Sequence, residues 1–296
     1  MQVAVYSQVL KPTDIPYVQE LINALAANNI STYVFSPYLQ MLRDGEITFP
    51  REVGTFENHL DFRVKPFDFV ITLGGDGTIL KATNLVRDCA VPIVGINLGR
   101  LGFLASIEKA MITETIELLK SGYYDIEERE MLKLESEAGL FGDLPYALND
   151  FTLLKRDTSS MITIHTYVNG DYLNSYWADG LIVATPTGST GYSLSCGGPI
   201  VFPGSGNFVI TPVAPHNLNV RPIVISDDSV VSFEVEGRAE NFLCTLDSRH
   251  EIIDETQAPL ALKKGDYSTK LVRIKDRSFL HTIRGKLHWG HDSRNH

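Results

Sequence analysis

A loop with three glycines and one carboxylate is the first part of the chain that could do chemistry. Gly74-Gly75-Asp76-Gly77-Thr78 follows the apolar run Phe69–Leu73 and precedes Ile79–Ala82, which can begin a helix. Glycines let a ligand approach the backbone closely, and free N–H groups at a helix N-terminus attract anions. The pattern therefore predicts a phosphate cradle. It is not a Walker A loop, which needs Gly-Lys-Ser/Thr, nor a dinucleotide fingerprint, which needs a glycine at position 80.

Asp76 is the unusual member of this loop. A carboxylate repels phosphate, so an anion cradle should contain one only for another purpose. It could accept a proton from an attacking hydroxyl or help to hold Mg²⁺. Alternatively, Asp76 is a turn aspartate that bonds its own backbone, as aspartates between glycines usually do. The strand before the loop and the helix pattern after it favour the functional interpretation.

A second unusual feature is a segment without charge. Gly180–Val220 contains no Asp, Glu, Lys or Arg, and its densest part, Thr185–Ser195, carries six Ser/Thr hydroxyls and the Tyr192 phenol. Hydroxyls and backbone N–H groups are neutral donors that can bind phosphate oxygens or nucleotide edges. The alternative is a buried crossover that lacks charge because it lies in the core. We favour a ligand wall, because a segment so rich in Gly, Ser and Thr is poor core material.

Other polar residues are less informative. Asn149-Asp150 precedes the apolar run Phe151–Leu154, and Asp179 precedes the uncharged segment; each could bind a ribose or adenine edge or form an ordinary turn. His216 is a lone loop histidine, and the remaining histidines show no metal-ligand spacing. A serine-hydrolase elbow is disfavoured, because Gly191–Ser195 lacks the closing glycine of G-x-S-x-G.

Strand and helix patterns alternate in the first half of the chain. Strands are expected at four apolar runs: Val3–Tyr6, Thr32–Phe35, Phe69–Leu73 and Pro92–Ile96. Helices are expected at Pro16–Asn28, with Asp14 as a possible cap, and at Met111–Lys120. Apolar strands that alternate with helices are typical of a parallel sheet covered on both faces. Residues 44–66 lack clear periodicity and are predicted to form a long loop.

The second half reads as β-structure. Ile162–Val168, Asn169-Gly170 and Tyr172–Trp177 predict a hairpin with a two-residue turn. Further strands are expected at Val231–Val235, Asn241–Leu246 and Leu271–Ile274, and Phe279–Gly290 resembles a loose tail that could dock on the first domain. We therefore expect an α/β N-terminal domain with a Rossmann-like parallel sheet (residues 1–125, with 276–296 returning to it) and a central all-β domain (126–275).

Charge and cysteine content exclude several classes of protein. The chain has 296 residues and a net charge of −10, which argues against binding of nucleic acid or of an anionic membrane. Three cysteines without C-x-x-C spacing fit a reducing, cytoplasmic location. We expect neither a signal peptide nor a membrane span, because no charged n-region and no run of about 18 apolar residues is present.

Several motifs together resemble the NAD kinases of bacterial type. The matching segments run in the family's order from about residue 69 to the Trp289-Gly290 end: Gly74–Thr78, Gly95–Leu104, Asn149-Asp150, Asp179–Pro199 and Thr211–Pro222. The first loop alone is only moderately specific, because diacylglycerol, sphingosine and 6-phosphofructo-kinases carry similar loops. The uncharged segment makes the match specific.

The resemblance implies a site between the two domains that transfers the γ-phosphoryl group of ATP to the 2′-hydroxyl of the adenosine ribose of NAD, giving NADP. It implies a divalent cation (Mg²⁺ or Mn²⁺), ATP as donor, an NAD-binding β domain, and a homodimer or homotetramer. Asp76 stands where the family has its proton acceptor. Nucleotide contacts are expected at these positions: Gly74, Gly75, Gly77, Lys81, Phe103, Asn149, Asp150, Asp179, Thr187, Thr190, Gly191, Tyr192, Ser193, Leu194, Ser195, Ala214 and Asp247.

The sequence departs from the family pattern at four places. Asp150 replaces a Glu found in many members, and Gly191 replaces a frequent Ala. Trp177 stands at a position that is often Arg, which puts any selectivity based on that Arg in doubt. Asp247 lies in Leu-Asp-Ser rather than the Asp-Gly often seen in the family. Two other functions stay open, a lipid kinase of the diacylglycerol type and a non-catalytic NAD(P) sensor.

Overall fold

The computed structural model describes residues 1–100, 102–156, 161–237, 241–257, 259–275 and 278–287. They form two compact units: unit 1 holds Met1–Glu128 and the described residues from Thr269 onward, and unit 2 holds Arg129–Ser268. The sequence places these boundaries after residues 125 and 275. Two long strands, β7 (Tyr124–Ser136) and β18 (Leu260–Ile274), carry the chain from one unit into the other.

Unit 1 is an α/β unit, as expected. Its strands are β1 (Gln2–Tyr6), β2 (Ser31–Phe35), β3 (Gly54–Phe56), β4 (Phe69–Leu73), β5 (Ile93–Asn97) and β6 (Ile107–Glu108). Its helices are α1 (Ile15–Ala27), α2 (Ser36–Asp44), α3 (His59–Val64), α4 (Asp76–Val86), α5 (Ile112–Ser121) and α7 (Phe279–Leu287). Three short 3-10 helices join them: η1 (Pro12–Asp14), η2 (Arg87–Cys89) and η3 (Lys109–Met111).

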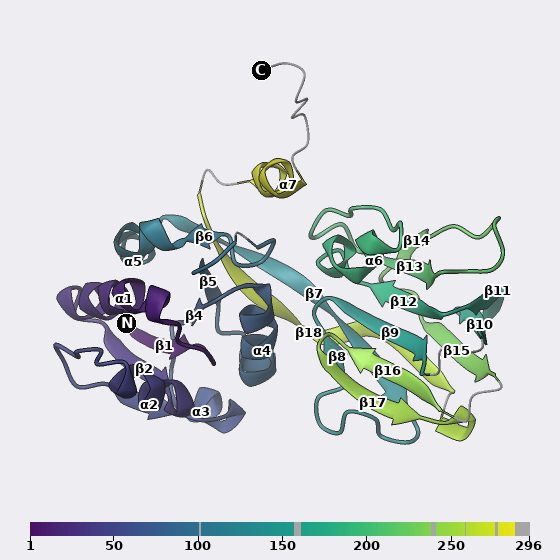
Figure 1. The fold of residues 1–296 in the computed structure, drawn as a ribbon, viewed down its shortest axis with the longest axis horizontal. Helices are drawn as coiled ribbons and strands as arrows, with labels where there is room; N and C mark the ends of the chain where they lie inside the picture. Colours follow the sequence, from purple (N-terminus) through teal and green to yellow (C-terminus); the bar gives the residue numbers. More distant parts are fainter. Residues whose placement is uncertain (101, 157–160, 238–240, 258, 276–277, 288–296) are drawn as a thin grey trace, which may run out of the picture. The chain divides into compact units, whose positions relative to one another are not determined.

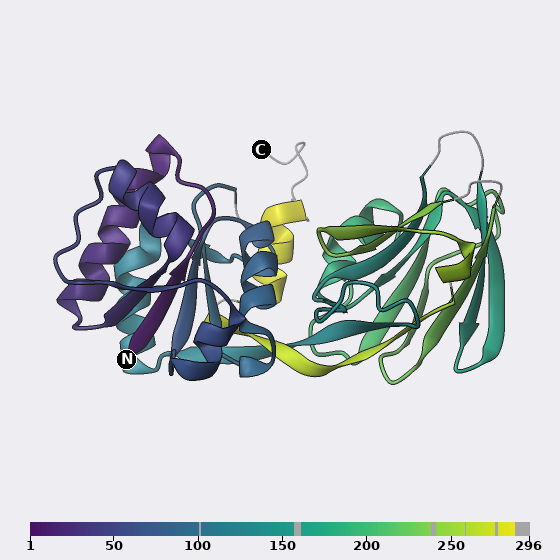
Figure 2. The ribbon, with the colours of Figure 1, turned by 90° about the horizontal axis from the view of Figure 1, so that it is seen from below.

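The sheet of unit 1 is parallel in every pair whose register is known. Its order is β5-β4-β1-β2-β3, with β6 and the end of β18 also paired to β5. All five residues of β4 are buried, as are all five of β5, which accounts for their unbroken apolar sequence. Helices cover the sheet on both faces (Figures 1 and 2).

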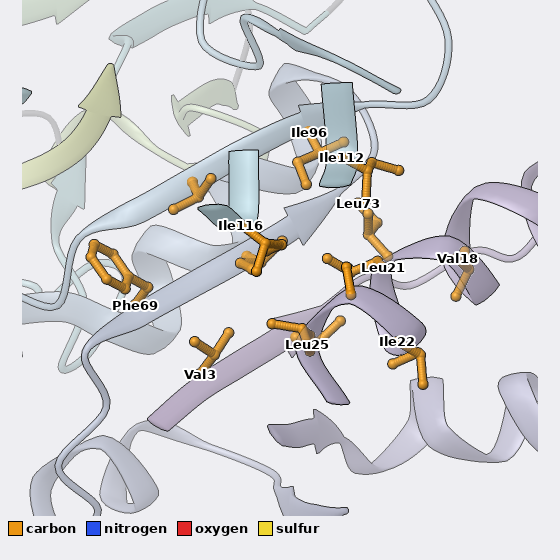
Figure 3. Packing of buried hydrophobic residues seen from close by; sticks show 14 of the residues in the cluster. Val3, Val18, Leu21, Ile22, Leu25, Phe69, Leu73, Ile96, Ile112 and Ile116 are labelled. Atoms are coloured by element: carbon orange, nitrogen blue, oxygen red, sulfur yellow. The ribbon is translucent and has the colours of Figure 1, made fainter. Parts of the chain in front are cut away.

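One core lies between the sheet and helices α1, α2 and α5. Val3, Phe69 and Ile96 of the strands point toward Leu21 of α1 and Ile116 of α5, as Figure 3 shows. Because neighbouring strand residues alternate between faces, Gly95 points to the opposite face. There a Cβ on Gly95 would lie 2.5 Å from Cδ1 of Ile79, so α4 packs closely on that face.

The expected long loop at residues 44–66 is wrong. The segment contains β3 and α3, and the preceding Ser36–Asp44 forms α2. Asn58 caps α3 by accepting the N–H of Leu60, and Asp61 completes a capping box. Both elements are short, and they are held by an aromatic cluster in which the Phe62 and Phe67 rings lie 5.1 Å apart.

The expected C-terminal tail also needs correction. Residues 279–287 form the helix α7, whose Ile283 is buried. Lys286 Nζ lies 5.1 Å from the centre of the Phe103 ring, so α7 contacts the segment that follows β5 in the same unit. Leu101 and Trp289-Gly290, which belong to the predicted motifs, lie outside the described residues.

Unit 2 is a β-sandwich, which confirms the expected β-rich domain. Its elements besides β7 and β18 are β8 (Tyr146–Ala147), β9 (Asp150–Lys155), β10 (Ile162–Val168), β11 (Asp171–Ala178), β12 (Gly180–Ala184), β13 (Asn207–Val213), β14 (Ile223–Ser226), β15 (Val231–Glu236), β16 (Phe242–Leu246), β17 (Arg249–Ile253), α6 (Tyr192–Ser195), η4 (Gly188–Thr190) and η5 (Glu255–Gln257). One sheet has the order β14-β13-β12-β9-β16-β17, and the other runs β11-β10-β15-β18 with β7 also on β18.

The two sheets of the sandwich share one core. The rings of Phe151 in β9 and Phe233 in β15 stack at 5.7 Å and close the space between the sheets. The predicted hairpin is β10–β11, and its turn residues Asn169 and Gly170 have φ values of +54° and +85°, as a type I′ turn requires. No described helix has the length and apolar character needed to cross a bilayer.

Candidate functional site

The glycine loop (Gly74–Thr78) lies where a doubly wound sheet reverses direction. β1 is followed by β2 and β3 on one side, whereas β4 and β5 lie on its other side. In such sheets ligands bind outside the carboxyl ends of the strands at this point. The ends of β1 and β4 are joined there, because Ser7 Oγ donates to the carbonyl of Leu73 at 2.8 Å. The sheet thus presents the glycine loop at the position where ligands are usually held.

Asp76 is the first residue of α4, and its carboxylate is held by backbone donors from a distant segment. Oδ2 accepts the N–H of Phe103 at 2.8 Å, while Oδ1 accepts those of Leu104 at 3.1 Å and Ala105 at 2.9 Å. Asp76 therefore does not bond its own turn, as the ordinary turn interpretation supposed. Oδ1 has two N–H donors and Oδ2 has one, so Oδ2 keeps an acceptor position for another group.

The glycines in and near this loop are of two kinds: packing within the chain excludes a side chain at some of them and not at others. A Cβ at Gly74 would lie 2.2 Å from Thr78 Oγ1, and one at Gly102 would lie 1.8 Å from Asp76 Oδ1. Gly74 and Gly102 are thus required by contacts within the chain. Gly75 and Gly77 are exposed, and a Cβ at either would have no atom within 4 Å. Packing does not explain these two glycines, whereas close approach of a ligand to the backbone would.

Two further predicted residues of unit 1 lie near the loop. Lys81, on α4, donates from Nζ to Gln8 Oε1 at 2.5 Å, just beyond the end of β1. Phe103 is half-buried and contributes the N–H that reaches Asp76. Lys81 is therefore a cation at the switch point of the sheet, and Phe103 acts on Asp76 through its backbone.

In unit 2, Asp247 ties the start of β9 to the β16–β17 turn. Its Oδ2 accepts the N–H of Leu148 at 2.9 Å, and its Oδ1 accepts that of Asn149 at 2.7 Å and that of Asp150 at 3.3 Å. Burial raises the pKa of Asp247, although the three N–H donors oppose that effect. Asp247 sits in the left-handed region with φ +52°, a conformation that Asp tolerates. Its role in this fold is to fix Asn149 and Asp150.

Asp150 is buried, and Gly191 of the uncharged segment lies beside it. Burial, and then the neighbouring charge of Asp247, raise the pKa of Asp150 to about 7. A Cβ on Gly191 would lie 3.8 Å from Asp150 Oδ2, so a side chain at position 191 would contact this carboxyl group. A carboxyl group that titrates near neutrality can accept or donate a hydrogen bond at physiological pH.

The hydroxyl-rich segment (Thr185–Ser195) is mainly an internal structure. Thr185 Oγ1 donates to the carbonyl of Leu148 at 2.6 Å, and Ser189 Oγ donates to that of Pro186 at 2.7 Å. Ser193 Oγ lies 2.8 Å from Thr211 Oγ1, and both residues are fully buried. The expectation that these hydroxyls form a ligand wall therefore needs correction for Thr185, Ser189 and Ser193, because each is bonded inside the protein.

A second part of this segment is accessible. Residues 181–189 are all buried, whereas Gly191, Tyr192 and Ser195 are exposed and Thr190 and Leu194 are half-buried. Gly188 is required by the fold, since its Cβ would lie 2.0 Å from the carbonyl oxygen of Asn149. Apart from the buried Ser193, residues 190–195 are thus the part of the segment that a ligand can reach.

Sequence reasoning missed a buried cation beneath this segment. Arg129, on β7, is 5% exposed, and its guanidinium lies 3.4 Å from Oγ1 of the equally buried Thr187. The two residues are 58 positions apart, so no local pattern could have paired them. An uncharged stretch of sequence thus does not create an uncharged environment.

The remaining predicted residues border β12 and β13. Asp179 forms an ion pair with Lys155 at 2.6 Å. Ala214 is exposed with φ +45°, at the end of β13. The exposed Trp177 packs on the ring of His216 at 4.3 Å, and its carbonyl accepts the His216 N–H. His216 therefore has a structural partner, as expected of a lone loop histidine.

The described residues offer one cluster of three metal-ligand side chains, His59, Asp88 and Cys89. Its donors are already engaged: Arg63 contacts Asp88 at 2.6 Å and His59 Nε2 at 3.1 Å. At the glycine loop, Asp76 is a single carboxylate that already holds three N–H groups. Mg²⁺ is commonly bound by one or two carboxylates together with substrate phosphates. The loop therefore fits a cation that arrives with a nucleotide rather than a resident metal.

Comparison with known proteins identifies both halves of the chain. Residues 9–124 match the family model of the ATP-NAD kinase N-terminal domain, and residues 148–274 match that of the ATP-NAD kinase C-terminal domain. An NAD kinase of Cytophaga hutchinsonii is 48% identical over 99% of both chains. One from Flavobacterium psychrophilum is 44% identical over the full length of both.

Solved structures agree on the fold. A yeast NADH kinase complexed with NADH superposes with a TM-score of 0.87 at 21% identity, covering 99% of this chain and 88% of that one. An Archaeoglobus fulgidus NAD kinase in complex with ATP gives a TM-score of 0.75 at 25% identity, covering 97% and 99%. Because the relatives match over nearly their whole length, the chain belongs to the NAD kinase family.

Proposed function

We propose that this chain transfers the γ-phosphoryl group of ATP to the 2′-hydroxyl of the adenosine ribose of NAD, giving NADP and ADP. The observation that carries the proposal is the arrangement of the glycine loop in a chain that matches NAD kinases from end to end. This loop combines two glycines that packing does not require with one fixed carboxylate that has an unused acceptor position.

ATP phosphates would bind at the glycine loop. The N-terminus of α4 supplies free N–H groups and the positive end of the helix dipole. Gly75 and Gly77 leave this backbone uncovered, and Lys81 can reach a phosphate by exchanging its partner Gln8. Mg²⁺ or Mn²⁺ would enter as a complex with ATP and neutralise part of the triphosphate charge.

Asp76 would accept the proton of the ribose hydroxyl. We assign this role to Oδ2, since Oδ1 already accepts two N–H groups. The N–H donors of Phe103, Leu104 and Ala105 hold the carboxylate in one orientation, so no reorganisation is needed when the hydroxyl arrives. Positioning of this kind is the main contribution that a protein makes to phosphoryl transfer.

NAD would be bound by the accessible residues of unit 2. Asn149, Thr190, Gly191, Tyr192, Leu194 and Ser195 are suited to contact it, with the exposed ring of Tyr192 available for stacking. The carboxyl group of the buried Asp150 lies beside Gly191 and could contact a bound nucleotide there. Asp179 and Ala214 are candidates at the neighbouring strand ends. We propose that Asp247, Thr187 and Ser193 position these residues instead of contacting NAD, because their side chains are bonded inside the unit.

The wider setting is also proposed. We expect the chain to form a homodimer or homotetramer. We also expect it to bind neither nucleic acid nor an anionic membrane, because its net charge is −10. A cytoplasmic location suits three cysteines that are all free thiols.

The decisive experiment is to measure NADP formation from NAD and Mg-ATP with an NADP-specific dehydrogenase. Asp76→Asn should bind NAD normally in calorimetry yet lose at least about 100-fold in kcat, the lower range for a general base. Asp44→Asn, an exposed change in the same unit, is the matched control and should keep wild-type kcat. Near-normal kcat in Asp76→Asn would refute the assignment of the base.

The same assay separates the alternatives. A lipid kinase would phosphorylate diacylglycerol and leave NAD unchanged, and a sensor would bind NAD or NADP without consuming ATP. Neither is favoured, because the relatives that match the whole chain are NAD kinases. The introduced amide can place its NH₂ group against the N–H of Phe103, which would destabilise Asp76→Asn. Thermal unfolding of the variant measures any such loss of stability and separates it from loss of the base.

A further inference from the structure

A cavity of about 600 Å³ lies within unit 2, formed by residues that the proposed function does not use. The residues that line it belong to the end of β7, the loop that follows it (137–145), β10, and the starts of β15 and β18. Small-molecule sites in proteins usually have volumes of about 300–1,000 Å³. The cavity therefore has the size of a ligand site.

The floor of this cavity is apolar. Leu134, Leu140, Phe233 and Leu260 line it, and each is at least nine-tenths buried. Phe233 and Leu260 are cross-strand partners, so the floor is a rigid part of the sheet. The loop that forms the other wall is anchored to β17, where Glu251 accepts the N–H of Phe141 at 2.9 Å. Such a surface favours a ligand with an apolar body.

The charged side chains that line the cavity are all carboxylates. Glu137 and Glu234 line it, and neither has an ion-pair partner among the described residues. The third carboxylate, Glu135, is paired with Lys263. Ser136 Oγ is buried and lacks any hydrogen-bond partner within the described parts of the chain. A buried hydroxyl without a partner is costly, and a ligand that donates a hydrogen bond would relieve that cost.

We propose that this cavity binds a small organic cation, namely a primary amine attached to an aromatic or alkyl body. The body would cover the apolar floor, and the ammonium group would lie between Glu137 and Glu234 with Ser136 as an acceptor. Tyr167 also lines the cavity, and an aromatic ring near an ammonium group adds a cation–π attraction. The proposal is independent of the proposed function, because none of these residues belongs to the glycine loop or the hydroxyl-rich segment.

Three probes of matched shape separate charge from apolar contact. In titration calorimetry with the full chain at low salt, 4-phenylbutylamine should bind with one site per chain. The neutral 4-phenylbutanol should bind more weakly by up to about fivefold, the largest factor that a solvent-exposed ion pair usually provides. The anion 4-phenylbutyrate should not bind. Raising the salt concentration should weaken binding of the amine and leave that of the alcohol unchanged.

Variants locate the site. Glu137→Gln combined with Glu234→Gln should reduce affinity for the amine to that of the alcohol, and Ser136→Ala should weaken the amine further. Glu114→Gln, an exposed change on α5 in unit 1, is the control and should bind the amine as the wild type does. Formation of NADP should be unchanged in all of these variants when no amine is present.

Specific outcomes would overturn the proposal. Equal affinity for amine and alcohol would show apolar contact only, and undiminished binding in the double variant would place the amine elsewhere. Loss of amine binding as protein concentration rises would assign the cavity to a second copy of the chain. Absence of any heat with the amine would show that the cavity does not hold this class of ligand.

Discussion

Gly77 offers a test in which stability and activity should move in opposite directions. It lies in the first turn of α4, is exposed, and has no atom within 4 Å of the position where a Cβ would be placed. Within a helix, alanine is more stable than glycine by about 0.5–1 kcal/mol, because glycine loses more backbone entropy on folding. Considered from the protein alone, Gly77→Ala should therefore be a stabilising and otherwise silent change.

The proposed phosphate site predicts a different result for catalysis. A methyl group on Gly77 would stand where the phosphate is proposed to contact the backbone of the glycine loop. Loss of one charge-assisted hydrogen bond costs about 1.5–3 kcal/mol, which corresponds to a decrease of roughly 10- to 100-fold in kcat/KM for ATP. We therefore expect a variant with a melting temperature raised by about 1–4 °C and with kcat/KM lowered by that factor.

The assay combines thermal unfolding without ligand with initial rates at varied ATP and saturating NAD. Gly285→Ala is the matched control, because Gly285 is also an exposed helical glycine with nothing within 4 Å of its Cβ position. This control should gain similar stability and keep full activity. If Gly77→Ala gains stability and keeps kcat/KM for ATP within about twofold of wild type, the glycine loop does not cradle phosphate.

Three further predictions test other parts of the site. Gly102→Ala should displace the Asp76 carboxylate, since a Cβ would lie 1.8 Å from Oδ1, and should lower kcat at least about 100-fold with little change in KM for ATP. Ser193→Ala should cost about 1–3 kcal/mol of unfolding free energy by leaving Thr211 without its partner, while KM for NAD stays within about threefold of wild type. For Asp150 the folded-state pKa of about 7 exceeds the reference value of 3.8, so its contribution is most favourable below pH 4 and is lost as pH rises toward 7. Between pH 5 and pH 8 only the two pH units below the folded-state pKa contribute, so urea unfolding should show a loss of up to about 2.7 kcal/mol in the wild type and a smaller loss in Asp150→Asn; equal losses would contradict the assigned burial.

The sequence predicted best those elements that are determined locally. β4 and β5 are buried on both faces, and their apolar runs are visible without knowledge of their neighbours. The β10–β11 hairpin was equally clear, because Asn169-Gly170 specifies its turn. By contrast, β3 and α3 escaped prediction, since three and six residues are too few to establish a period.

Long-range contacts were beyond the reach of sequence patterns. The same composition, rich in Ser and Thr and free of charge, suits both a ligand wall and a buried crossover. Thr185 and Ser193 belong to the crossover, because their partners Leu148 and Thr211 lie on other segments of the chain. Within this stretch only Thr190, Gly191, Tyr192, Leu194 and Ser195 keep the exposure that a ligand wall requires. Burial separates the two interpretations, and burial depends on tertiary structure.

Asp76 shows most clearly what the fold adds to a motif. The sequence offered a choice between a turn aspartate, bonded to nearby backbone, and an active carboxylate. In the structure its oxygens do accept backbone N–H groups, but these belong to residues 103–105. A carboxylate bonded only within its own turn would move with that turn. The N–H donors of residues 103–105 instead fix the Asp76 carboxylate relative to the segment that follows β5. Because they divide unequally between the two oxygens, one oxygen is saturated and the other can still accept a proton. Structural and catalytic roles are therefore compatible in this residue, and Gly102, which makes room for the carboxylate, is as necessary to the arrangement as Asp76 itself.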